Sequence, residues 1–132
     1  MAVHALSVQK RYFDTIKDGT KKVEGRVGKV DTSKGINENY KESQSVYKQD
    51  DEIKFVISGE EETSEILMCK ILKVEFFDTI EDMLKLCGLS NCLPGITSYE
   101  EGVQIYHGFP NYAEREKLYG AIGIYVQVLK TV

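Results

Sequence analysis

Strand-like and helix-like segments follow one another along the chain in an order that restricts its fold. Five segments have the alternating or β-branched patterns typical of strands: residues 3–8, 21–27, 51–57, 64–77 and 120–132. Four segments have the apolar spacing or the terminal residues of helices: 11–19, 78–88, 98–106 and 111–120. This mixture predicts an α+β fold, in which a mostly antiparallel sheet curls into a small β-barrel with flanking helices.

The length of 132 residues is that of one domain, and we expect a single domain over residues 1–132. No apolar run approaches the roughly 18 residues that a membrane-spanning helix needs. Residues 1–13 have no basic segment before their apolar residues and no signal-type cleavage site. We therefore expect a cytoplasmic protein, or a nuclear one in a eukaryote, that has no membrane partner.

The three cysteines are an odd number and indicate no disulfide framework. Cys87 and Cys92 are five positions apart with neither histidine nearby, which argues against a zinc site. Cys69 lies in the apolar run EILMCKIL and is expected in the core. We expect reduced thiols, no bound metal and no cofactor.

The formal net charge of −4 argues against a protein that coats nucleic acid by charge alone. Positive charge is concentrated in residues 9–29, where seven Lys and Arg residues face three acidic ones. Such a local basic region can still bind one nucleotide or one strand end. We therefore expect no DNA-coating protein, and the composition leaves open whether the partner is a nucleotide or a strand end.

The segment GTKKVEGR, residues 19–26, joins a helix end to a charged strand. Gly19 is in a position to end the preceding helix. Because strand side chains alternate between faces, Glu24 and Arg26 share one face, and Lys21 lies at the turn before it. Two interpretations stay open: a surface ion pair of little energetic value, or the wall of a ligand site.

The chain resembles the ASCH-domain family, whose signature is G-x-K-x-x-E-x-R after the first helix. The residues that match the signature are Gly19, Lys21, Glu24 and Arg26. A D-x-I-x-F strand, an LPG turn and a closing EREKLYGAIGIYV segment follow in family order, so the resemblance covers nearly the whole chain. One departure is that the family strand usually opens with Gly-Asp, whereas this chain has Asp50 before Asp51. The resemblance implies a PUA-like β-barrel with helices alongside and a cleft lined by the signature.

The family includes RNA-binding modules, a ribonuclease, and amidohydrolases that deacetylate N4-acetylcytidine with a lysine, a threonine and a glutamate. Lys21 fits that lysine, but the threonine position corresponds to Glu24, so a threonine nucleophile is not carried over. The resemblance thus implies a nucleoside- or RNA-directed protein. Either it is a metal-independent hydrolase of amidohydrolase or ribonuclease type, or it is a non-catalytic RNA- or nucleotide-binding module.

Hydrolysis of an amide needs a base, a positive group near the developing oxyanion and a proton donor for the leaving amine. Glu24 is the predicted base and Lys21 the predicted donor or oxyanion stabiliser. Arg26 is predicted to hold Glu24 or the ligand. Glu101 is a second candidate catalytic carboxylate, with a capping box begun by Ser98 as its alternative role.

Aromatic side chains gather in the last helical segments, and nucleobases stack on such rings. Tyr106 and Tyr112 are therefore predicted to bind the ligand. Gly19, as part of the signature, is also predicted to line the cleft.

Residues 28–50 are polar and are expected to form a long loop, a type of segment that is usually functional or mobile. If the protein were an interaction adaptor, this loop would be its natural contact, although no sequence feature favours that function.

Overall fold

The computed structural model describes residues 1–31, 36–38 and 46–132. The strands of the main sheet are β1 (Val3–Val8), β2 (Val23–Val27), β5 (Glu52–Ile57), β6 (Leu67–Phe77) and β7 (Ala121–Thr131). The helices are α1 (Lys10–Asp18), α2 (Ile80–Cys87), α3 (Leu89–Cys92), α4 (Tyr99–His107) and α5 (Tyr112–Tyr119). Two short strands, β3 (Lys29–Asp31) and β4 (Ile36–Glu38), pair with each other inside the predicted 28–50 loop. Residues 32–35 and 39–45 of that loop lie outside the described residues.

The five-stranded sheet has the order β1-β5-β6-β7-β2 and is mixed. Three of its pairings are antiparallel, as predicted, whereas β1 pairs with β5 in parallel. β1 and β2 occupy the two edges, and the chain passes from one edge to the other through α1. The prediction of a barrel is therefore wrong in part: among the described residues each edge strand has a backbone ladder on its inner side only, and the sheet is an open half-barrel with flanking helices.

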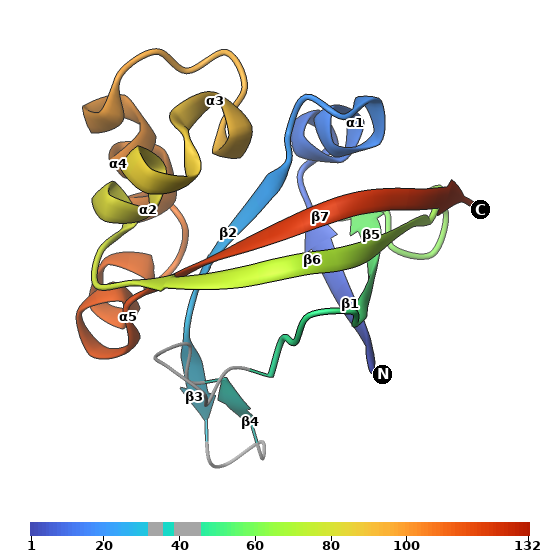
Figure 1. Cartoon of the computed structure of the whole chain (residues 1–132), viewed down its shortest axis with the longest axis horizontal. Coiled ribbons are helices and arrows are strands. Elements are labelled where there is room, and N and C mark those ends of the chain that lie inside the picture. The colour runs from blue at the N-terminus through green and yellow to red at the C-terminus, as the bar shows by residue number, and fades with distance from the viewer. Residues whose placement is uncertain (32–35, 39–45) are drawn as a thin grey trace.

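The two longest strands, β6 and β7, form an antiparallel ribbon of 11 residues each. Their register shifts between Met68 and Cys69 and again between Ile71 and Lys73. Such bulges bend a strand and increase its twist. All helices from α2 to α5 are inserted between these strands, and Figure 1 shows them gathered at one end of the ribbon. Two strands that are neighbours in space thus carry a helical cluster at the end where β6 stops and β7 starts.

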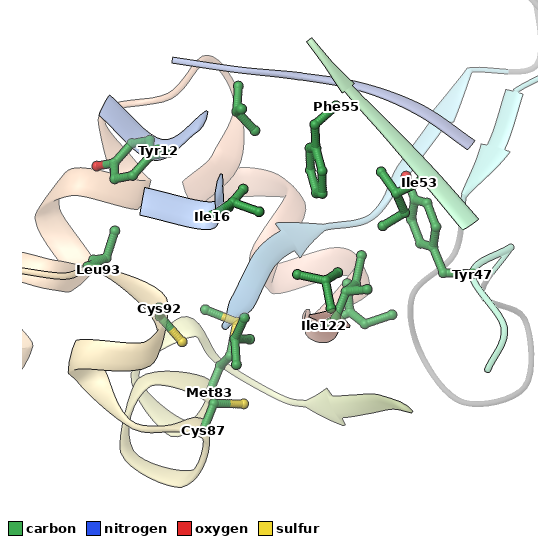
Figure 2. Close-up of a cluster of buried hydrophobic side chains, with 14 of the residues drawn as sticks. Tyr12, Ile16, Tyr47, Ile53, Phe55, Met83, Cys87, Cys92, Leu93 and Ile122 are labelled. Atoms are coloured by element: carbon green, nitrogen blue, oxygen red, sulfur yellow. The ribbon is translucent and has the colours of Figure 1, made fainter. Parts of the chain in front are cut away.

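The core lies between α1 and the inner face of the sheet, and it continues under α2 (Figure 2). Its largest fully buried side chains include Phe13 and Ile16 from α1, Phe55 from β5 and Ile122 from β7. The three cysteines are free and buried, and the prediction of Cys69 as a core residue is confirmed.

The apolar spacing of residues 78–88 predicts that Ile80, Met83, Leu84 and Leu86 face inward, but helix α2 buries a different set. Its buried residues are Ile80, Met83, Leu84 and Cys87, whereas Leu86 is 73% exposed. Two residues along a helix correspond to about 200°, so Leu86 points away from the face that carries Leu84. The prediction of an inward Leu86 is wrong for this reason.

The ends of the helices were predicted with mixed success. Gly19 ends α1 in a left-handed conformation with φ 88°, and the Ser98 hydroxyl accepts from the Glu101 N–H at 3.0 Å, as predicted. The sequence also predicts Asn111 as the N-cap of α5, with Glu114 at N3, but the φ of Asn111 is 64° and its side chain makes no capping hydrogen bond. An N-cap normally needs an extended backbone, so the predicted cap does not form. No helix in the described ranges is both long and apolar enough to cross a membrane.

Candidate functional site

A pocket of about 320 Å³ opens beside the two edge strands of the sheet. Its walls come from three parts of the chain: the β1–α1 junction, β2, and the helical cluster that ends in α4 and α5. Ser58, just beyond β5, also lines it. The pocket therefore lies where the sheet is open, and the strand that carries the signature forms one of its walls.

Lys21 is buried at this pocket, with only 2% of the residue exposed. Its backbone N–H donates to the Thr15 carbonyl at 2.9 Å, which folds the chain back beneath α1 after Gly19. The Lys21 Nζ donates to the carbonyl oxygens of Val23 at 2.7 Å and Cys92 at 2.5 Å. It also lies 3.4 Å from the Glu24 Oε1. Two of the three N–H donors of the ammonium are therefore used by backbone carbonyls, and its charge is paired with that of Glu24.

Glu24 and Arg26 lie on one face of β2, as the alternation predicted, and their side chains pair directly. The Glu24 Oε2 accepts from Arg26 Nε at 3.1 Å and from Nη2 at 2.8 Å. The Glu24 side chain is only 9% exposed, so the interpretation as a simple surface ion pair does not hold. The Arg26 Nη2 also donates to the Ser7 carbonyl at 3.3 Å, so one side chain links the edge strands β2 and β1.

These three side chains give the pocket a positive balance of charge. The Glu24 carboxylate lies between the Lys21 ammonium and the Arg26 guanidinium, and each cation is within ion-pair distance. Two positive groups therefore face one negative group. A cluster of this composition suits a ligand that carries negative or electron-rich atoms.

Gly25 allows the helices to approach the signature strand closely. It pairs with Gly123 of β7, and a Cβ at position 25 would lie 2.6 Å from both Met83 Cε and the Tyr106 hydroxyl oxygen. Gly25 was not predicted as a functional residue. The sequence feature that could have indicated its role is a glycine in the middle of a predicted strand, because such a glycine often marks the close approach of another group.

Two tyrosines from different helices reach the pocket, and both residues are more than nine-tenths buried. Tyr12 of α1 is 8% exposed and Tyr106 of α4 is 3% exposed. Burial raises the pKa of both phenols above its usual value, and the nearby Glu24 carboxylate adds to this effect. The spacing of Tyr12 with Phe13 and Ile16 predicts only an apolar helix face, so the sequence offers no signal that Tyr12 reaches a pocket.

The predicted ligand-binding residues Tyr106 and Tyr112 both line the pocket, with Phe109 between them. The rings of Tyr106 and Phe109 have centroids 6.1 Å apart, and those of Phe109 and Tyr112 are 5.3 Å apart, both edge to face. This arrangement is favourable for aromatic pairs. The three rings form an apolar wall beside the charged cluster.

The structure does not bring two of the predicted residues into this pocket. Glu101 is exposed in the first turn of α4, where its N–H meets the Ser98 hydroxyl, and it does not line the pocket. Gly19 instead borders a separate hollow of about 480 Å³ together with Lys17 and Lys22. The physical reason is local: a capping box fixes Glu101 at a helix start, and Gly19 lies at the opposite end of α1 from the pocket.

No group of three or more His, Cys, Asp or Glu side chains in the described ranges is arranged to hold a metal ion. The residues that can contact a ligand are instead a carboxylate, a guanidinium, phenols and backbone groups. These groups can bind by hydrogen bonding and stacking, and the carboxylate can act as a general base.

The fold and the pocket define a class of small α+β proteins in which an open half-barrel carries a buried Lys–Glu–Arg cluster. The model of the ASCH domain family matches residues 6–129, and the chain belongs to this family. A comparison with curated proteins finds no match.

Two solved structures share the fold over almost their full length. The crystal structure of the hypothetical protein PH0355 is 29% identical and covers 98% of this chain and 100% of its own, with a TM-score of 0.68. The solution structure of the protein PF0455 from Pyrococcus furiosus is 28% identical and covers 97% of this chain and 98% of its own, with a TM-score of 0.65.

Proposed function

We propose that this ASCH-domain protein binds a nucleoside unit, either free or within RNA, in the pocket beside β1 and β2. The observation that carries the proposal is the buried cluster of Lys21, Glu24 and Arg26 beside an aromatic wall. The volume of about 320 Å³ lies in the range of small-molecule pockets, which combine apolar walls with a few oriented polar groups.

Each part of the pocket has a partner on a nucleoside. The rings of Tyr106, Phe109 and Tyr112 offer an apolar surface to a flat base, and stacking is worth about 1–3 kcal/mol per base. The Glu24 carboxylate can accept a hydrogen bond from an exocyclic amine, and the Arg26 guanidinium can donate to a base carbonyl. The net charge of −4 favours a small ligand or a strand end over a long RNA track.

Hydrolysis of an N-acylated nucleoside is a second candidate, and the buried position of Glu24 at the pocket favours it. In this reaction Glu24 takes a proton from water, and the hydroxide attacks the acyl carbonyl. The tetrahedral intermediate then expels the base amine, which receives the proton from Glu24, so that N4-acetylcytidine and water give cytidine and acetate.

The contacts of Lys21 favour a different role from the predicted proton donor. Two of its three N–H donors are taken up by the Val23 and Cys92 carbonyls, and the ammonium as a whole is paired with Glu24, which ties it to the carboxylate rather than to a leaving group. We assign Lys21 as a positioning residue that holds the Glu24 carboxylate, while Glu24 and Arg26 contact the ligand.

Isothermal titration calorimetry with the four ribonucleosides, N4-acetylcytidine and a short RNA tests the proposal. We expect at least one of these to bind wild type and to bind Glu24→Gln about tenfold or more weakly. The control Glu101→Gln removes an exposed carboxylate outside the pocket and should bind like wild type. The proposal would be overturned if wild type bound none of these ligands, or if Glu24→Gln and Glu101→Gln lost affinity to the same extent.

A turnover assay separates the two candidate functions. Release of cytidine and acetate from N4-acetylcytidine by wild type, lost in Glu24→Gln and kept in Glu101→Gln, would establish the hydrolase. Cleavage of the RNA alone would indicate a ribonuclease. Binding without any product would leave a non-catalytic nucleoside- or RNA-binding module.

A further inference from the structure

We infer that the pocket contains a subsite for a phosphate monoester at the N-terminus of α1, so that the preferred ligand is a nucleoside 5′-monophosphate or a 5′-phosphorylated RNA end. The inference deepens the proposed function and rests on it for the nucleoside part of the ligand. The phosphate part rests on the geometry of α1 and of two tyrosines.

The N-terminus of α1 has the chemistry of an anion site. Its N-cap residue Gln9 makes no side-chain capping hydrogen bond, and the first turn contains no acidic residue. The first two N–H groups of this nine-residue helix, those of Lys10 and Arg11, have no acceptor among the described residues. Free N–H groups and the positive end of the helix dipole together favour a phosphate.

This helix end opens onto the pocket. Ser7, Val8 and Gln9 join β1 to α1, and all three line the pocket. Ser58, which follows the parallel neighbour β5, lines it as well. The pocket is thus at the carboxyl ends of two parallel strands, which is where open sheets with helices commonly bind their ligands.

Two tyrosine hydroxyl groups point independently to a ligand. Tyr12 lies in the first turn of α1 and Tyr106 in α4; both residues are more than nine-tenths buried and line the pocket. Neither hydroxyl has a hydrogen-bond partner within residues 1–31, 36–38 and 46–132. Because no buried side-chain polar atom in these ranges lacks a partner, both hydroxyls are open to the pocket rather than enclosed in the core. Burial of the two residues raises the pKa of both phenols, so they remain protonated at neutral pH and can donate to a ligand oxygen.

Two arginines add positive charge near this end. Arg26 of β2 lines the pocket, and the guanidinium of the exposed Arg11 lies 5.1 Å from the centre of the Tyr12 ring, although Arg11 itself does not line the pocket. The charge of Glu24 is offset by Lys21 and Arg26. A dianionic phosphate would therefore meet N–H donors, phenols and a guanidinium group without an unpaired carboxylate beside it.

The substitution Gln9→Asp tests the subsite without damaging the fold. An N-cap aspartate bonds to the free N–H groups and stabilises a helix, so we expect the melting temperature to stay the same or to rise. The same carboxylate would occupy the phosphate position and repel an anion. The matched control is Gln127→Glu, which adds one negative charge on the exposed surface of β7, away from the pocket.

The measurement compares the four ribonucleosides with their 5′-monophosphates by calorimetry, and follows the amide resonances of Lys10 and Arg11 during titration with inorganic phosphate. We expect a monophosphate to bind wild type and Gln127→Glu about tenfold or more tightly than its nucleoside. In Gln9→Asp this preference should disappear, and phosphate should no longer shift the two amides.

Equal affinity for a nucleoside and its monophosphate would overturn the subsite and leave the proposed function intact. A phosphate response at Lys10 and Arg11 that Gln9→Asp abolishes, without binding of any nucleoside, would support the subsite and overturn the proposed function. If phosphate shifted neither amide in wild type, the subsite would be wrong.

Discussion

The Lys21 ammonium donates a hydrogen bond to the carbonyl oxygen of Cys92, a residue 71 positions further along the chain. This bond joins the segment before β2 to the end of α3. The same ammonium lies 3.4 Å from the Glu24 carboxylate, so the helical cluster and the acidic group are held by one buried cation. A buried charge is tolerated only when it is paired and hydrogen-bonded, and Lys21 meets both conditions.

Replacement of Lys21 by methionine should destabilise the fold as well as the pocket. The substitution keeps the side-chain volume but leaves the Val23 and Cys92 carbonyls without their buried donor and removes one of the two cations beside the Glu24 carboxylate. Breaking a buried pair in this way costs about 3–5 kcal/mol of unfolding free energy. Urea denaturation measures the loss. The control Lys10→Met breaks an exposed pair with Asp14 and should cost at most about 1 kcal/mol; equal losses in both variants would contradict the prediction.

Replacement of Gly25 by alanine should weaken ligand binding through crowding. The new Cβ would lie 2.6 Å from Met83 Cε and from the Tyr106 hydroxyl oxygen. The end of the Met83 side chain can move aside, but the phenol is held by its ring, so we expect a loss of about 1–3 kcal/mol of unfolding free energy. Thermal denaturation and nucleoside titration check the two effects.

A second substitution identifies the group that clashes with alanine at position 25. In the Gly25→Ala background, Tyr106→Phe removes the hydroxyl and should recover part of the lost stability. Ligand affinity should stay low, because the phenol donor is gone. If Tyr106→Phe lowered the stability of Gly25→Ala further, the contact with the hydroxyl would not be the source of the strain.

The carboxylate of Asp51 should make stability depend on acid pH. Burial of Asp51 disfavours its charge, but hydrogen bonds from the Ala2 N–H, the His4 ring and the Lys48 N–H outweigh burial, and the pKa of Asp51 lies below its ordinary value. This contribution is therefore fully present above the ordinary pKa of about 3.9, and it is lost as the pH falls through the lower folded pKa.

Substitution of Asp51 by asparagine should remove that pH dependence. Denaturation curves between pH 7 and pH 2 should show wild type losing its excess stability over Asp51→Asn in the most acidic part of this range. At pH 7 we expect the variant to be about 1–3 kcal/mol less stable. Asp14→Asn, in which the replaced side chain is 53% exposed, is the control. A constant gap between wild type and Asp51→Asn at every pH would contradict the prediction.

The departure from the family pattern at Asp50 should carry a conformational cost. Asp50 has a φ of 73°, the left-handed region in which glycine is free of strain and other residues are not. Its ion pair with Lys70 is solvent-exposed and contributes little. We expect Asp50→Gly to be about 1 kcal/mol more stable than Asp50→Ala in urea denaturation. Equal stability of the two variants would show that the backbone relaxes at this position.

Local patterns predicted the segments of the fold well because they depend on near neighbours. The helix end at Gly19, the capping box at Ser98 and the shared face of Glu24 and Arg26 each follow from residues at most a few positions apart. The parallel pairing of β1 with β5 does not, because the choice of partner strand is made across the whole domain. For the same reason, strand patterns alone did not distinguish a closed barrel from an open one.

Only part of the candidate site could be predicted, because the rest depends on contacts between residues that are far apart in the sequence. The signature identified Lys21, Glu24 and Arg26, but the burial of Lys21 depends on Cys92, which is far away in sequence. Tyr12 has the spacing of a core residue, and only the fold brings its hydroxyl to a pocket. For Glu101 the sequence favours a capping-box role over a catalytic one; its N–H does bond to the Ser98 hydroxyl, and only the fold shows that Glu101 does not line the pocket.

The insertion of α2–α5 between β6 and β7 gives the aromatic wall of the pocket a different origin from Glu24 and Arg26. Strand β2 supplies these two charged side chains, whereas the inserted helices supply the three rings. Because β6 and β7 pair with each other along the whole ribbon, the inserted segment can change in length or sequence while the sheet keeps its register. Evolution can therefore reshape the aromatic wall by changing one continuous stretch of the chain, provided that the carbonyl of Cys92 stays in place to hold Lys21.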